Sequence, residues 1–303
     1  MLLNCKGLLR SDPRATLGTV RGEQIVILTE TWLGEDDTPP PLSGYTAYNF
    51  PRPRNGRVGG PTRGGVVVYL SCDLAAFVST WPDERYEGGQ FSWLRIDEDA
   101  GLPTDLYLGA CYFPPAATSQ QRVTAADAWD ALGAAAAEAS GLGMVMLAGD
   151  FNAHTGASDG RHSDHASAPL NPAGRALLQM TEAVGLTIAN GRVPGATSGA
   201  YTFHGIIRGN SVVDYFLLCP ALLHAATALE IALPPVPGMD HGVLRLQLGG
   251  LQPRVPEAPA PPAASVPMLA SLPAHRPTQE QRTACACRMS EDDVAATLEA
   301  LAL

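Results

Sequence analysis

The sequence predicts an α/β fold in which two mixed β-sheets pack face to face and helices flank them, giving a four-layer sandwich. Two observations lead to this expectation. Short apolar runs rich in Val, Ile and Leu outnumber the segments with a helical period. Many of these runs are apolar at nearly every position, which is typical of strands that are buried on both faces. With 303 residues, 46% of them hydrophobic, the chain can bury a core of that size.

Four strands are expected in the first part of the chain. Residues 24–29 form a short apolar run, and residues 66–70 form a second one after two glycines. Residues 91–96 alternate between apolar and polar side chains, as a half-exposed strand does. Residues 106–112 form the fourth run, which must end before Pro114 because proline cannot continue a sheet ladder.

A helix, a buried strand and a second helix follow. Residues 120–139 are rich in Ala and contain no Pro, which predicts a helix. The apolar run 144–148 predicts a buried strand. Asn171, followed by a proline, is a good N-cap for a second helix, and Gly185 is placed to end it. Further strands are expected at residues 186–189, 201–203, 211–219, 228–233 and 242–248.

The composition divides the chain into one domain and a tail. Residues 1–249 hold all of these elements. Residues 250–289 are rich in Pro and Ala and read as a linker that is expected to be disordered. Residues 290–303 begin with a Ser and three acidic residues, which predicts a short C-terminal helix.

Composition also limits the class of protein. No run reaches the roughly 20 apolar residues of a membrane helix, and the first residues lack the features of a secretory signal. The six cysteines are scattered without a metal-ligand spacing, which favours a reducing, intracellular compartment, nuclear or cytoplasmic. The net charge of −10 argues against binding nucleic acid by bulk charge alone. A local basic loop nevertheless exists, which is either a DNA-binding loop or a solvated surface loop: Arg52, Arg54, Arg57 and Arg63.

Polar side chains stand where the predicted strands end. Asp150 and Asn152 follow a buried strand, and alternation along a strand directs both to the same side of the backbone. A lone acid such as Asp214, inside an apolar run, is costly to bury unless it is paired or binds a metal. The positions with this strand-end geometry are Asn4, Glu30, Tyr112, Asp150 with Asn152, Asp214, and Asp240 with His241.

In these motifs the chain resembles the endonuclease/exonuclease/phosphatase superfamily, whose fold is DNase I-like. The nearest resemblance is to the endonuclease domain that precedes the reverse transcriptase of non-LTR (LINE-type) retrotransposons. The motifs occur in the family's order from residue 4 to residue 241, which makes their combination specific. They are Leu3-Asn4-Cys5-Lys6-Gly7-Leu8, Leu28-Thr29-Glu30-Thr31-Trp32-Leu33, Arg63-Gly64-Gly65-Val66, Tyr112-Phe113-Pro114-Pro115, Gly149-Asp150-Phe151-Asn152-Ala153-His154, Val213-Asp214-Tyr215 and Asp240-His241.

The resemblance implies phosphodiester hydrolysis with Mg²⁺, for which Mn²⁺ can substitute. Glu30 would hold the ion, with Asn4 beside it; carboxylate oxygens are ligands that Mg²⁺ prefers. Asp150 would deprotonate the attacking water, and Asn152 would hydrogen-bond the phosphate. Duplex DNA is the implied partner, together with a reverse transcriptase module in a longer parent protein.

The remaining site residues also receive roles from the resemblance. His241 would contact the scissile phosphate, with Asp240 fixing its tautomer. Tyr112 would donate to a phosphate oxygen, and Asp214 would lie near the leaving group. Thr202 is a further expected phosphate contact, and the substrate-binding loop would contain Arg52, Arg54 and Arg57.

One competing motif and two departures from the family pattern affect these expectations. Ser163-Asp164-His165 matches the usual Ser-Asp-His motif by letter, but only Asp240-His241 leads into a strand, so the role falls to His241. Met239 replaces the usual hydroxyl residue. Only three residues precede Asn4, so the first strand is expected to be truncated.

Three functions remain open from the sequence. A DNA-nicking endonuclease of the retrotransposon type is the leading hypothesis. The alternatives are an abasic-site nuclease or a phosphatase of the same fold, and a decayed retrotransposon remnant that has lost turnover. A serine hydrolase and a P-loop protein are disfavoured, because no G-x-S-x-G turn follows a predicted strand and no G-x-x-x-x-G-K-[ST] loop is present in the sequence.

Overall fold

The computed structural model describes residues 1–10, 12–52, 64–82, 89–115, 119–157, 160–196, 199–206 and 209–250. The predicted linker beyond Gly250, the predicted C-terminal helix at 290–303, and Arg54 and Arg57 lie outside the described residues. Within the described ranges, no helix has the length and apolar character needed to cross a membrane.

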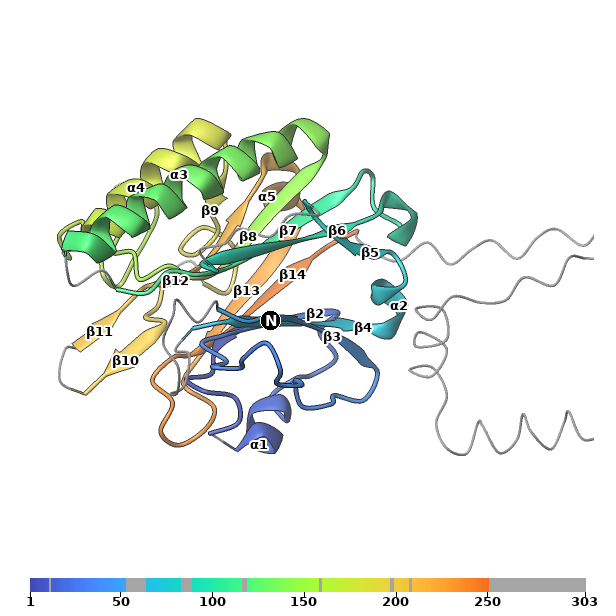
Figure 1. Cartoon of the computed structure of the whole chain (residues 1–303). Helices are drawn as coiled ribbons and strands as arrows, with labels where there is room; N and C mark the ends of the chain where they lie inside the picture. The colour runs from blue at the N-terminus through green and yellow to red at the C-terminus, as the bar shows by residue number, and fades with distance from the viewer. Residues whose placement is uncertain are drawn as a thin grey trace, which may run out of the picture.

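Two mixed β-sheets of six strands each pack face to face, which confirms the predicted fold (Figure 1). In each sheet the two central strands are parallel and the other pairs are antiparallel. The first sheet has the order β13 (Ala226–Ala232), β14 (Val243–Leu248), β1 (Leu2–Asn4), β2 (Ile25–Thr29), β4 (Val66–Ser71) and β3 (Tyr45–Phe50). The second has the order β5 (Val78–Thr80), β6 (Phe91–Ile96), β7 (Leu106–Tyr112), β8 (Met144–Asp150), β12 (Asp214–Leu218) and β9 (Thr187–Ile188).

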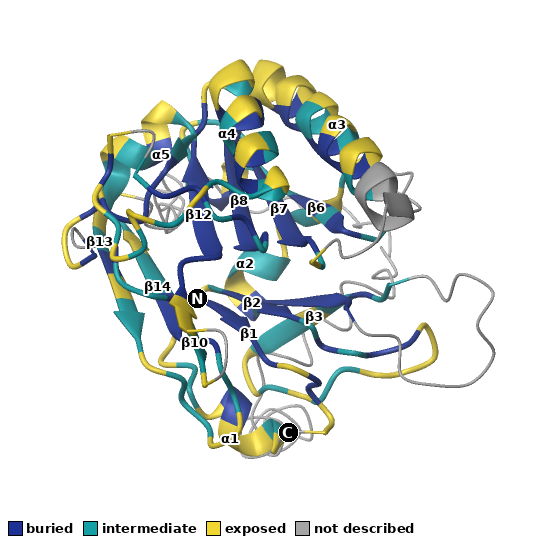
Figure 2. Cartoon of the chain, turned by 90° about the vertical axis from the view of Figure 1, so that its left-hand side faces the viewer, coloured by how far each residue is buried: buried dark blue, intermediate teal, exposed yellow. Residues whose placement is uncertain are grey.

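The central strands of the second sheet are buried on both faces, which explains their unbroken apolar character (Figure 2). Leu108 and Met146 face the core between the sheets. Tyr107 and Val145 face the opposite side and pack against two helices, α3 (Ser119–Leu142) and α4 (Pro172–Val184). The side chain of Asn171 caps α4 by accepting from the N–H of Gly174 at 2.6 Å, as predicted, and Gly185 ends the helix in the left-handed conformation.

The outer face of the first sheet is covered by α1 (Pro13–Leu17) and the loops around it (Figure 1). Leu17 of α1 packs there with Leu3, Val26 and Tyr69. The first strand, β1, is only three residues long but occupies the centre of its sheet. Leu2 pairs with Leu244 on one side and with Ile27 on the other.

Several elements differ from the prediction, chiefly at the edges of the sheets. The edge strand β3 lacks an apolar run because most of its residues are only half-buried. The strand expected at 211–219 begins only at Asp214, and the one expected at 201–203 begins at Phe203, where it forms a separate hairpin. The other elements are β10 (Phe203–Gly205), β11 (Gly209–Ser211), α2 (Cys72–Ala75), α5 (Pro220–Ala225) and a 3₁₀ turn at Glu98–Ala100.

Candidate active site

The central parallel strands of both sheets end at the same edge of the sandwich. In the first sheet Asn4 is level with Thr29, so Glu30 follows immediately. In the second sheet Tyr112 is level with Asp150. Because the neighbouring strands β12 and β14 are antiparallel to these pairs, they start where the pairs end. Asp214 therefore lies opposite Asp150, and His241 lies just before β14.

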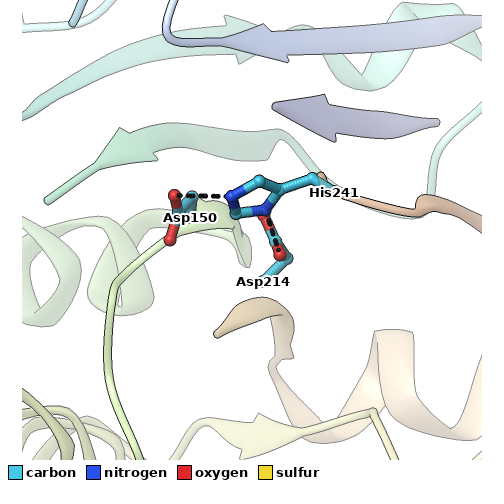
Figure 3. A group of neighbouring side chains, drawn as sticks. All are labelled: Asp150, Asp214 and His241. Atoms are coloured by element: carbon cyan, nitrogen blue, oxygen red, sulfur yellow. Dashed lines mark hydrogen bonds and ion pairs between the residues drawn. The ribbon is translucent and has the colours of Figure 1, made fainter. Parts of the chain in front are cut away.

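Asp150, Asp214 and His241 form a compact buried cluster at this edge (Figure 3). Nδ1 of His241 lies 2.8 Å from Oδ2 of Asp214, which is a hydrogen bond. Nε2 of His241 lies 3.9 Å from Oδ2 of Asp150, which is too long for one. The ring of Phe203 packs edge-on against the imidazole at 5.1 Å. The imidazole is thus held at Nδ1, and its Nε2 is directed toward Asp150.

Burial and charge shift the pKa values of this cluster. Burial by itself would lower the pKa of His241, but Asp214, Asp150 and Asp240 outweigh it and raise the pKa to about 9. Burial and the charge of Asp214 raise the pKa of Asp150 to about 7. At neutral pH the imidazole is therefore charged, whereas Asp150 is poised to exchange a proton.

The expected partner of His241 was wrong. Asp240 does not orient the imidazole; its Oδ2 instead accepts from Nζ of Lys6 at 2.5 Å. Asp214, from the neighbouring sheet, occupies Nδ1 of His241. The physical reason is alternation, since adjacent residues of an extended segment point to opposite sides.

Asp150 is fixed by two asparagines. Nδ2 of Asn4 donates to Oδ2 of Asp150 at 2.9 Å, and the backbone N–H of Asn152 donates to Oδ1 at 2.9 Å. Nδ2 of Asn152 donates to the carbonyl of Phe113 at 2.9 Å. Asn4 was expected beside Glu30 as a metal ligand, but its amide nitrogen is committed to Asp150 and its Oδ1 accepts from the N–H of Lys6.

Glu30 is held by two aromatic donors. The hydroxyl of Tyr112 donates to Oε1 at 2.5 Å, and Nε1 of Trp32 donates to Oε2 at 3.3 Å. Burial and the charge of Glu30 raise the pKa of Tyr112, so its hydroxyl stays protonated and remains a donor. In this structure Tyr112 therefore donates to Glu30, where a phosphate oxygen was the expected acceptor. Each carboxylate oxygen of Glu30 retains lone-pair capacity for a cation.

Thr202, which was expected to contact phosphate, has a structural role in this geometry. Its side chain is fully buried, and its Oγ1 accepts from the N–H groups of Val213 at 3.0 Å and Asp214 at 3.1 Å. These two bonds fix the backbone at the start of β12, and a contact of Thr202 with phosphate stays a prediction. Arg52 is half-buried and close enough to Tyr112 to act on its pKa, so it does border the cluster.

The model of the endonuclease/exonuclease/phosphatase family matches residues 1–241, which is most of the chain. The chain belongs to this family. A comparison with curated protein sequences finds no match.

Solved structures of nucleases share the fold of this endonuclease/exonuclease/phosphatase protein. A 3′-5′ exonuclease (NExo) from Neisseria meningitidis matches with a TM-score of 0.60 and 17% identity, covering 82% of this chain and 98% of that one. The AP endonuclease LMAP from Leishmania major has a TM-score of 0.66 and 14% identity, covering 82% and 86%. An AP endonuclease from Archaeoglobus fulgidus has a TM-score of 0.58 and 16% identity, covering 82% and 97%. At such identities the likeness is one of fold.

The donor set of this family member fits a divalent cation. Among the described residues, Asp150, Asp214 and His241 each offer an atom within 4.8 Å of the others, so this group could hold a metal ion. Oδ1 of Asp214 is buried without a hydrogen-bond partner among the described residues. However, a charged imidazole repels a cation, and Mg²⁺ prefers oxygen ligands. The more exposed carboxylate of Glu30 is therefore the better anchor.

Three residues support the site although the sequence assigned them no part in it. Trp32 holds Glu30, and Asn171 holds Asn152 by donating from Nδ2 to its backbone carbonyl at 2.8 Å. Lys6 holds Asp240. Trp32 and Lys6 lie within motifs that the resemblance had already marked, so their position was the available signal. His165, of the competing Ser-Asp-His motif, instead packs against His154 at 4.9 Å.

Proposed function

We propose that this protein is a divalent-metal-dependent phosphodiester hydrolase that nicks duplex DNA, of the type associated with non-LTR retrotransposons. The carrying observation is the cluster in which Asp214 and Asp150 flank the imidazole of His241. The motif order from residue 4 to residue 241 supports the retrotransposon type, in which a reverse transcriptase module would be the partner. DNA as the substrate is supported by the fold neighbours, one of which is a 3′ phosphatase from Neisseria bound to a product DNA hairpin.

The cation would be held by Glu30, with Asp150 nearby. When bound, a divalent ion of this kind neutralises charge on the phosphate and on the leaving oxygen. Mg²⁺ is the favoured ion because the anchor is a carboxylate. The donors Tyr112 and Trp32 would keep Glu30 in one orientation.

The chain's own residues account for the proton movements. Asp150, oriented by Asn4 and the backbone of Asn152, accepts a proton from the attacking water. His241 is held by Asp214 with its Nε2–H aimed at the cluster, where it donates to a phosphate oxygen. This charge-assisted bond strengthens as negative charge builds up on the phosphate.

Abasic-site cleavage or removal of a 3′ phosphate is the second candidate. This candidate is supported by the solved structures that share the fold, which include AP endonucleases and a 3′ phosphatase. Both candidates use the same cluster and differ in the DNA that reaches it.

A nicking assay tests the proposal. Purified protein should convert supercoiled plasmid to the open-circle form with Mg²⁺, and EDTA should stop the reaction. Asp150→Ala or His241→Ala should abolish nicking, whereas His165→Ala, the matched control from the competing motif, should retain it. Parallel assays with an abasic duplex and a 3′-phosphate hairpin separate the two candidates. Intact DNA of every kind, with Mg²⁺ or Mn²⁺, would contradict catalysis and leave a retrotransposon remnant.

A further inference from the structure

Lys6 is the only lysine in a chain that contains nineteen arginines. Its ammonium lies 2.5 Å from Oδ2 of Asp240, the residue directly before His241. Its backbone N–H donates to Oδ1 of Asn4 at 3.1 Å, and the same amide group holds Asp150. Both the side chain and the backbone N–H of the single lysine are therefore hydrogen-bonded to residues at the edge where the proposed catalytic residues lie.

The backbone of Lys6 marks it as part of this site. Among the described residues, four that are not glycine have a positive φ: Lys6 at 50°, Glu30 at 51°, Trp32 at 58° and Asn152 at 46°. Glu30 and Asn152 belong to the site, and Trp32 donates to Glu30. Left-handed backbone is unfavourable for such residues, and strain of this kind concentrates at functional sites.

Hydrogen bonds to the neighbouring strand end impose this conformation. The N–H of Gly7 donates to the carbonyl of Glu30 at 2.7 Å, and the N–H of Leu8 donates to that of Thr31 at 2.9 Å. The segment after β1 is thereby fastened to the segment after β2. This fastening directs the side chain of Lys6 across the edge toward Asp240.

Stability does not explain the Lys6–Asp240 pair. The two side chains are 47% and 25% exposed. Ion pairs as exposed as this contribute little to stability, and less than a left-handed backbone costs. Solvent-facing donors on the ammonium are, in contrast, what a phosphate needs. The guanidinium of Arg10, which lies over the ring of Trp32 at 5.4 Å, adds a second positive charge beside the same edge.

We propose that Lys6 is a substrate-binding residue whose ammonium binds a backbone phosphate of the DNA strand at this site, with Asp240 holding it in position. The inference rests on the function proposed above and adds a residue to it. A lysine ammonium is a compact charge with three donors, so one can remain on Asp240 while the others reach phosphate oxygens. In a chain with a net charge of −10, such a local cation also offsets repulsion of DNA.

DNA binding in EDTA tests the proposal without requiring catalysis. Lys6→Ala should weaken binding of a duplex by about fivefold and reduce the slope of log Kobs against log salt by about 0.9, the value for one lost phosphate contact. Lys6→Arg should restore the slope. The matched control is Arg21→Ala, because Arg21 forms an exposed ion pair with Glu230 and lies before β2, at the opposite edge of the sheet. It should leave the slope unchanged.

Chemical labelling gives an independent readout, because only one side chain carries a primary amine. Pyridoxal 5′-phosphate followed by borohydride should form one stable adduct on Lys6, and fragment masses separate it from the α-amino group of Met1. Saturating duplex DNA in EDTA should suppress this adduct. If Lys6→Ala binds with unchanged affinity and slope, or if bound DNA gives no protection, the role of Lys6 is refuted while nicking by the wild type still supports the proposed function. If the wild type neither binds nor cleaves DNA, the proposed function fails as well.

Discussion

The replacement Asp214→Asn isolates the residue that holds His241 in its charged form. The Nδ1–Oδ2 bond of 2.8 Å lies within a buried cluster, so solvent does little to screen it. The pKa of His241 is about 9, compared with its usual 6.5. A rise of this size corresponds to roughly 3 kcal/mol in favour of the imidazolium. Asparagine keeps the shape of the side chain but removes its charge.

In Asp214→Asn, the imidazole of His241 should lose most of its positive charge at pH 8. Burial is the largest influence on His241 and lowers its pKa; without the charge of Asp214, only Asp150 and Asp240 oppose it, so the pKa should fall toward its usual 6.5. A pKa of 6.5 would reduce the charged fraction at pH 8 from about 90% to about 3%, which sets an upper limit of about 30-fold on the slowing of nicking. The acid limb of the profile, which Asp150 sets near pH 7 in the wild type, should move to lower pH in the variant, because the charge of Asp214 is one of the causes that raise the pKa of Asp150.

The assay is a pH–rate profile of plasmid nicking, combined with an NMR titration of the imidazole. Asp240→Asn is the control for the position of the basic limb: it also removes a carboxylate near His241, but Asp240 contributes least to raising the pKa, so the limb should stay near pH 9 even though the loss of the partner of Lys6 lowers the rate. The raised pKa of His241 also makes folding depend on pH. It stabilises the folded chain fully below pH 6.5, and this stabilisation is lost as the pH rises through 9. The urea midpoint of the wild type in EDTA should therefore fall over that range more than that of Asp214→Asn. A basic limb that stays near pH 9 in Asp214→Asn would refute the reasoning.

Two further predictions concern the buried hydrogen bonds of Thr202 and the arginine loop at residues 52–57. Thr202→Val should lower the free energy of unfolding by about 2–4 kcal/mol, because two buried N–H groups lose their acceptor. Urea denaturation measures this free energy. The control Thr227→Val, at an exposed site, should change it little. Equal losses of unfolding free energy in the two variants would contradict a stabilising role for the buried bonds. Replacing Arg52, Arg54 and Arg57 by Ala should weaken DNA binding and reduce its salt slope by up to about 2.7, whereas an unchanged slope would make the loop an ordinary surface.

The layered fold could be predicted because its central strands carry their own signal. A strand buried on both faces, such as β8, must be apolar throughout, and few other structures require this. Edge strands are different. The residues of β3 are mostly half-buried, so neither an apolar run nor a strict alternation marks them. The hairpin of β10 and β11 was missed for a related reason, since it stands apart from both sheets.

The site could be predicted as a set of positions, but its pairings could not. Strand ends identify which residues gather at the edge, because parallel strands finish together. They do not say which side chain faces which. Asp240 was paired with His241 because the two are adjacent in sequence, yet the extended backbone separates them and brings Asp214 from the other sheet instead. The hydrogen bonds from the N–H groups of Val213 and Asp214 to Thr202 likewise join segments that no pattern in the sequence had paired.

The charges of the side chains at this edge explain why positively charged side chains are needed there. Four carboxylates border it: Glu30, Asp150, Asp214 and Asp240. Against them stand the imidazolium of His241, the ammonium of Lys6 and the guanidinium of Arg52. A phosphodiester adds one more negative charge, and its transition state concentrates that charge on the oxygens. The protein's own groups therefore leave the edge negative when a phosphodiester is bound, and a divalent cation at Glu30 would neutralise that excess. Under the proposed function, His241 and Lys6 would then bind the phosphate, while Asp150 would keep the basicity needed to accept a proton.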